Sequence, residues 1–176
     1  MEVHVYADCE TVKLFLNGKE IGSKPGGRAA RYDVTFQVPY EKGEPKAIAL
    51  TKRKAVAETA LTTAGRPANI RLTADRDSIA NDRYDLCYVK AEVLDADGHP
   101  VPDEEGPKLR FTVSGPGELA AVGSGSPTTM ESFRQPTRTP WRGKCLAILR
   151  PKDIGTMVLK AEADGLFPAE IRILIR

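Results

Sequence analysis

The aromatic and basic residues between positions 131 and 142 are the part of the sequence whose chemistry best suits ligand binding. Trp141 is the only tryptophan of the chain. An exposed indole with polar donors beside it can stack on a sugar ring, because its face is large and apolar. The predicted carbohydrate-binding residues are Trp141, Phe133, Arg134, Arg138, Arg142 and Glu131. In the alternative interpretation, Trp141 is a plug that pins the loop from 123 to 143 to the edge of a sandwich.

Two carboxylates are associated with that loop: Glu118 lies just before it and Glu131 lies within it. Glycoside hydrolysis needs two opposed carboxyl groups on a rigid scaffold. Nothing in the sequence ties these two to a shared cleft, so we expect no catalytic pair and no catalytic residue in the chain.

The glycine-rich stretch Gly115–Ala120 fits the dinucleotide pattern G-x-G-x-x-A. That site needs a helix directly afterwards, and the strand-like Leu119–Val122 follows instead. We therefore interpret the stretch as a turn and predict no cofactor. The basic run Lys52–Lys54 is interpreted in the same way, as a solvated hairpin tip, because no basic surface extends from it.

Metal binding is also not expected. Asp95 and Asp97 before Gly98 resemble the start of a calcium loop, but the later glutamate is missing. A hairpin tip explains this stretch better. The two histidines, His4 and His99, have no spaced partner for a zinc site and are expected on the surface.

Three cysteines, Cys9, Cys87 and Cys145, cannot all pair with one another. Their spacing fits neither a disulfide framework nor a metal motif. We expect three reduced and mostly buried thiols.

The charge balance limits the partners. The 26 basic and 24 acidic residues leave a net charge of +2, which gives no long-range field to attract nucleic acid or an anionic membrane. No apolar run approaches the roughly 20 residues that cross a bilayer. Residues 1–4 show neither a basic nor an apolar signal region.

Alternation of apolar and polar residues with period two dominates the chain and predicts an all-β fold. Asn17-Gly18 between apolar strands is a strong hairpin signal. The expected strands of the first part lie near 3–6, 12–16, 32–38, 46–50 and 56–62. Those of the second part lie near 69–73, 86–94, 109–113, 118–122, 144–149, 157–163 and 171–175.

The pattern is broken at Gly65 and Pro67 and restarts at Ile70. This break divides the chain into two tandem immunoglobulin-like β-sandwich domains, residues 1–64 and 65–176. The loop from 123 to 143 has no apolar periodicity, and loops of that length are usually functional or form interfaces.

Several ordered motifs resemble one family. Val12–Lys19 with Ile21-Gly22, Val38–Gly43 and Thr63–Ala68 are similar to the small C-terminal β-domain of bacterial glycoside hydrolase family 2 enzymes, which are mostly β-galactosidases. Val113–Glu118 and Gly143–Arg150 resemble the last, bacterial immunoglobulin-like (invasin-like) domain of that family.

The resemblance implies a non-catalytic C-terminal region that supports a retaining glycosidase. Its two catalytic glutamates lie in a TIM barrel that has no counterpart here, and that barrel would be the partner. It also implies a periplasmic or cell-surface location in a bacterium. Two other hypotheses stay open: a carbohydrate-binding module that uses Trp141 and the loop, and a structural spacer like the repeats of bacterial adhesins.

Overall fold

The computed structural model describes residues 1–102 and 106–176 of the chain and divides it into two compact units. The first unit is Met1–Thr63 and the second is Ala64–Arg176. We expected the division one residue later, between 64 and 65. The prediction of an all-β fold is confirmed, since the described residues form strands and a single short 3₁₀ turn.

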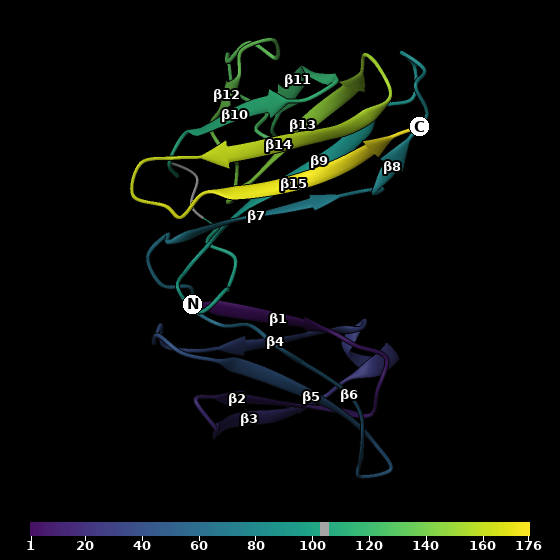
Figure 1. Cartoon of the computed structure of the whole chain (residues 1–176). Coiled ribbons are helices and arrows are strands. Elements are labelled where there is room, and N and C mark those ends of the chain that lie inside the picture. The colour runs from purple at the N-terminus through teal and green to yellow at the C-terminus, as the bar shows by residue number, and fades with distance from the viewer. Residues whose placement is uncertain (103–105) are drawn as a thin grey trace. The chain divides into compact units, whose positions relative to one another are not determined.

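The first unit is a small sandwich of two sheets (Figure 1). One sheet has the order β3-β2-β5-β6 and the other pairs β1 with β4. Its elements are β1 (Glu2–Tyr6), β2 (Thr11–Leu16), β3 (Lys19–Pro25), the 3₁₀ turn η1 (Gly27–Ala30), β4 (Asp33–Gln37), β5 (Pro45–Thr51) and β6 (Lys54–Ala60). Buried side chains of both sheets meet in one core, among them Val12, Leu14, Val34, Phe36 and Ala47.

The hairpin predicted from Asn17-Gly18 is confirmed. Both residues have positive φ, 52° and 79°, as a tight two-residue turn between β2 and β3 requires. The basic tip is confirmed as well, since Lys52 and Arg53 form the turn between β5 and β6.

The second unit is a larger sandwich, drawn in teal to yellow in Figure 1. One sheet has the order β11-β13-β9-β7 and the other β12-β10-β14-β15-β8. Its strands are β7 (Asn69–Ala74), β8 (Ser78–Ile79), β9 (Cys87–Leu94), β10 (Leu109–Ser114), β11 (Gly117–Gly123), β12 (Thr137–Arg138), β13 (Lys144–Pro151), β14 (Gly155–Glu162) and β15 (Ala169–Ile175).

The core between these two sheets is made by every second residue of the long strands. Val89 on β9, Ala147 on β13, Phe111 on β10, Leu159 on β14 and Ile173 on β15 are all buried. Alternation of this kind explains why the long strands were predictable, since one face of each packs inward.

Several details differ from the predicted strands. β6 ends at Ala60 rather than at 62, and Tyr32 lies outside β4 and is exposed. β3 is absent from the expected ranges, although the Asn17-Gly18 hairpin implies a strand after the turn. β8 and β12 were not predicted, because two residues are too few to show a periodicity.

No helix in the described ranges has the length and apolar character that a membrane crossing demands.

Candidate functional site

A buried arginine holds the long loop. Arg138 on β12 is fully buried, with an exposed fraction of 0%. Its guanidinium donates hydrogen bonds to the backbone carbonyls of Val122 at 2.8 Å, Glu131 at 3.3 Å and Ser132 at 3.3 Å. A side chain predicted to contact a ligand therefore lies inside the protein and ties the loop to β11.

Glu131 completes this arrangement from the loop side. Its carboxylate accepts hydrogen bonds from Lys108 Nζ at 2.8 Å, Thr139 N at 2.9 Å and Thr139 Oγ1 at 3.0 Å. Burial raises the pKa of Glu131, but the hydrogen bonds from Lys108 and Thr139 outweigh it and lower the pKa from 4.5 to about 2. At neutral pH the group is ionised, so it holds no proton to donate.

Replacing Glu131 with glutamine is expected to flatten the acid dependence of stability. The folded pKa lies below the unfolded one, so the carboxylate stabilises the fold fully above pH 4.5 and loses this effect as the pH falls towards 2. The shift corresponds to at most about 3 kcal/mol. Urea unfolding at several pH values should show the difference between wild type and Glu131→Gln shrinking from pH 7 to pH 2.5.

The matched control for this series is Glu170→Gln, because Glu170 is exposed at the surface of the same unit. Its free energy of unfolding should stay within about 0.5 kcal/mol of wild type. If the difference in free energy of unfolding between wild type and Glu131→Gln were the same at every pH, the lowered pKa of Glu131 would be contradicted.

Phe133 and Arg134 lie at the outer side of the loop. Phe133 is 61% exposed, and the Cζ atom of Arg138 lies 4.9 Å from the centre of its ring. Arg134 is exposed, and its backbone N–H donates to Ser132 Oγ at 3.2 Å. Phe133 thus contacts Arg138, whose guanidinium also lies beside Glu131.

Trp141 is placed by a tight hairpin. Arg142 and Gly143 have positive φ of 50° and 72°, and Trp141 and Lys144 exchange backbone hydrogen bonds of 2.9 Å and 3.1 Å. This is the geometry of a two-residue turn, in which the flanking residues lie directly opposite each other. Trp141 and Lys144 are therefore neighbours at the start of β13.

The indole of Trp141 is half-buried. The Cζ atom of Arg142 lies 4.7 Å from the centre of the ring. Gly125 lies so close that an added Cβ would be 3.1 Å from Trp141 Cε3. The side chain contributes to both interpretations made from the sequence, since it packs on the loop and also retains an accessible part.

The strand register brings further residues to this place. Leu146 on β13 is opposite Gly123 on β11 and Lys90 on β9. Two residues further along β9, on the same face of the sheet, Glu92 is opposite both Lys144 on β13 and Arg71 on β7.

Glu92 is the one anion among these three paired residues, Arg71, Glu92 and Lys144. Its side chain is 4% exposed, and its oxygens lie 2.9 Å from Arg71 Nη2, 3.1 Å from Lys90 Nζ and 3.9 Å from Lys144 Nζ. Burial raises the pKa of Glu92, but the hydrogen bonds from Lys90 and Arg71 prevail and hold it below its ordinary value. Three cations thus share one carboxylate.

Two hollows adjoin Trp141. The larger measures about 670 Å³ and is lined by apolar, glycine and basic residues, among them Trp141, Leu146, Gly125, Lys90 and Lys144. The smaller measures about 260 Å³, and Glu131, Thr139 and Trp141 lie in its wall. Trp141 and Arg142, both predicted from the sequence, line the larger hollow, and Trp141 also lines the smaller one.

Glu118 lies apart from this group. It is on β11 and forms ion pairs with Arg150 at 3.2 Å and Lys152 at 3.0 Å. These cations stabilise the ionised form of Glu118, as Lys108 stabilises that of Glu131. Neither carboxylate has the raised pKa that a general acid needs.

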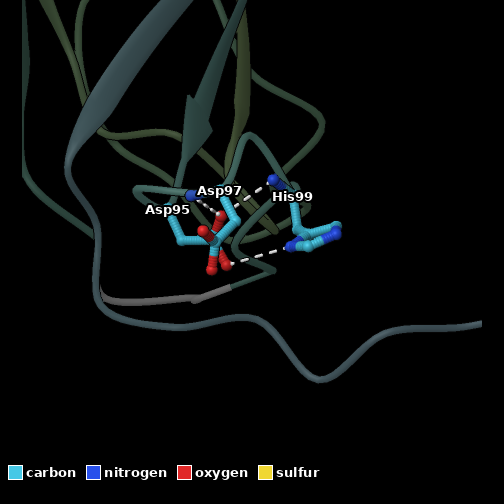
Figure 2. A group of neighbouring side chains, drawn as sticks. All are labelled: Asp95, Asp97 and His99. Atoms are coloured by element: carbon cyan, nitrogen blue, oxygen red, sulfur yellow. Dashed lines mark hydrogen bonds and ion pairs between the residues drawn. The ribbon is translucent and has the colours of Figure 1, made fainter. Parts of the chain in front are cut away.

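The turn at Asp95 and Asp97 gathers more groups than the sequence predicted. Their carboxylates and the ring of His99 lie within 4.8 Å of one another (Figure 2). The sequence predicts no partner for His99 in a triad or a zinc site; in the structure the turn brings His99 Nδ1 to 3.4 Å from Asp95 Oδ2.

The contacts of Asp95 explain the cluster without a metal. Its Oδ1 accepts from the backbone N–H of Asp97 at 3.0 Å and of His99 at 2.8 Å, and its Oδ2 accepts from that of Gly65 at 2.7 Å. These bonds, with Gly65 first, lower the pKa of Asp95. The residue fastens the start of the second unit to its first hairpin, which agrees with the predicted hairpin tip.

The predicted burial of the three thiols is confirmed, since Cys9, Cys87 and Cys145 are all buried, and none is paired in the structure. Cys87 and Cys145 are on adjacent strands of one sheet, opposite Leu149 and Ala91 respectively. They are therefore four positions apart along the ladder, and each points into the core.

These thiols are expected to be unreactive in the folded chain. Burial raises the pKa of Cys87 and of Cys145 to about 12 in each case, and the thiolate is the reactive form. Ellman's reagent should detect three thiols in urea and react slowly with native protein. A native thiol that reacts within seconds would contradict the burial of these groups.

The fold and the site together define a tandem β-sandwich module without an assembled catalytic pair among its described residues. Residues 70–172 match the family described as glycoside hydrolase family 2 C-terminal domain 5, and residues 1–57 match a domain of unknown function, DUF4982. The chain belongs to the family 2 C-terminal region.

Relatives show the same assignment. The chain is 40% identical over 169 residues to a β-galactosidase of Bacteroides ovatus, covering 96% of this chain and 20% of that protein. It is 30% identical over 150 residues to a putative β-glucuronidase of Formosa agariphila, covering 84% and 14%.

Solved structures agree. A family 2 glycosyl hydrolase of Bacteroides cellulosilyticus superposes with a TM-score of 0.95 at 34% identity, over 100% of this chain and 23% of that one. A β-glycosidase of Bacteroides vulgatus gives 0.89 at 29% identity, over 99% and 22%. The prediction of a non-catalytic C-terminal part of a family 2 protein is confirmed, and the chain spans between 14% and 23% of these relatives.

Proposed function

We propose that the chain is the supporting C-terminal region of a retaining β-glycosidase with β-galactosidase-like activity. The observation that carries this proposal is the 40% identity to the Bacteroides ovatus β-galactosidase over nearly the whole chain. About four-fifths of that relative lies outside the match, which leaves ample chain for a catalytic domain.

The partner in this proposal is a TIM barrel that carries the two catalytic glutamates. The chain's contribution is mechanical: its sandwiches pack against the barrel and hold the rim of the active site. The ion-paired states of Glu118 and Glu131 support a structural role for both carboxylates.

A hydrolysis assay tests the division of labour. The purified chain should give no release of nitrophenol from an aryl β-galactoside above the buffer rate. Turnover that follows the chain through purification would overturn the proposal, because no second domain would then be needed.

The predicted location, the periplasm or cell surface of a bacterium, rests on the family resemblance alone. Fractionation of the source cells, with the chain detected by antibody, is the corresponding measurement. Recovery in the cytoplasmic fraction would argue against it.

A further inference from the structure

The larger hollow beside Trp141 combines an aromatic wall with a cluster of cations. We propose that it binds a sugar residue that carries an acidic group, a carboxylate or a sulfate. The proposal concerns a ligand site on the second unit and does not depend on the activity of any catalytic domain.

The apolar part of the hollow suits the face of a pyranose ring. Trp141 and Leu146 supply side chains, and Gly125 lets the Trp141 ring pack closely against the backbone, since an added Cβ there would lie 3.1 Å from Trp141 Cε3. Sugars place their C–H groups against such surfaces, while an aliphatic ligand would need a more enclosed cavity. The volume of about 670 Å³ is within the range of small-molecule sites.

The polar part favours an anion. Lys90 and Lys144 lie in the wall of the hollow and share Glu92 with Arg71, so three positive charges meet one negative charge. Glu92 is buried beneath these side chains, whereas Lys90 and Lys144 are about half exposed. A ligand entering the hollow therefore meets ammonium groups before it meets the carboxylate.

One buried polar atom also lies at this place. Ser124, in the wall of the hollow, has a buried Oγ without a hydrogen-bond partner among the described residues. Buried hydroxyls are normally satisfied, so this atom offers a donor or acceptor to a ligand or to a water beneath it.

The charge count covers only the described residues. Asp103, Glu104 and Glu105 follow Pro102 in the sequence and lie outside them. The variant Asp103→Asn with Glu104→Gln and Glu105→Gln is therefore part of the test. It should bind the acidic sugar at least as tightly as the wild type, and loss of binding in this variant would overturn the assignment to the hollow.

The sole tryptophan makes the site directly measurable. Fluorescence of Trp141 is followed while trigalacturonate, a sulfated carrageenan tetrasaccharide or neutral galactotriose is added. We expect a saturable change with at least one acidic sugar, with a Kd on the order of 1 mM or below, and at least about tenfold weaker binding of galactotriose. A rising salt concentration should weaken the binding of the acidic sugar, because salt screens the attraction between opposite charges.

Two variants test whether binding depends on the lysines of the hollow or only on the positive charge of the protein. The double variant Lys90→Gln with Lys144→Gln should lower the affinity for the acidic sugar by about tenfold or more, because two charge-assisted contacts are lost. The control Lys160→Gln removes a lysine paired with Glu162 on the opposite sheet and should leave binding unchanged. Calorimetry with Trp141→Ala, which has no tryptophan fluorescence, should show loss of binding.

The proposal would be overturned by the absence of saturation with every acidic sugar, by equal affinity for galactotriose, or by unchanged affinity in the double lysine variant. Equal affinity for tetraglutamate would do the same, because the hollow would then recognise charge without sugar.

Discussion

Replacing Arg138 with alanine is expected to lower the free energy of unfolding of the second unit by about 3 kcal/mol or more. The side chain is fully buried, and its removal leaves the Val122 carbonyl without its 2.8 Å donor. It also takes a cation from Glu131, whose Oε2 lies 3.7 Å from Arg138 Nη1. Breaking a buried charged pair from one side commonly costs this much.

Urea unfolding followed by Trp141 fluorescence measures this effect in the second unit, where the only tryptophan lies. Arg134→Ala is the matched control, because Arg134 is in the same loop and exposed. It should change stability by no more than about 0.5 kcal/mol. Equal stability of the two variants would show that Arg138 does not hold the loop.

The second large effect is expected for Gly143→Ala, at about 3 kcal/mol or more. Gly143 has φ of +72°, which L-residues adopt at a cost of about 1–2 kcal/mol. An added Cβ would also collide with the backbone carbonyl of Val101. A backbone atom cannot yield as a flexible side chain does, so overpacking adds to the conformational cost.

Gly98→Ala separates these two contributions. Gly98 has a similar φ of +86°, but no atom lies within 4 Å of an added Cβ. Its loss should therefore be limited to the conformational part, about 1–2 kcal/mol. If urea unfolding gave both variants the same stability, the close approach to Val101 would have no energetic weight.

The sequence predicted those parts of the fold that have a local signature. The alternation in β10 and the Asn17-Gly18 turn identify strands and a hairpin without knowledge of their partners. The short strands β8 and β12 have no such signature, since their existence depends on the strands beside them.

The site was less predictable, because burial and register are tertiary properties. Arg138 has the same residue type as Arg134, and only packing makes one buried and the other exposed. Lys90 lies about 50 residues from Trp141 and reaches the hollow through the pairing of β9 with β13. The Arg142-Gly143 turn, which places Lys144 opposite Trp141, was not predicted from the sequence.

Carbohydrate binding by Trp141, Phe133, Arg134, Arg138, Arg142 and Glu131 stays a prediction as it was made from the sequence. The structure buries Arg138 beside the partly buried Glu131, leaves Phe133 and Arg134 exposed, and places Trp141 and Arg142 in the wall of the larger hollow. Ligand contact is thus expected at Trp141, while Arg138 and Glu131 act on the loop's conformation.

A domain exchange tests the central claim most directly. The matching C-terminal region of the Bacteroides ovatus β-galactosidase is replaced with this chain, and hydrolysis of an aryl β-galactoside is compared with that of the enzyme truncated before the region. We predict that truncation removes activity or thermal stability and that the exchanged chain restores it. A truncated enzyme with full activity and stability, or a folded chimera no better than the truncation, would contradict a supporting role.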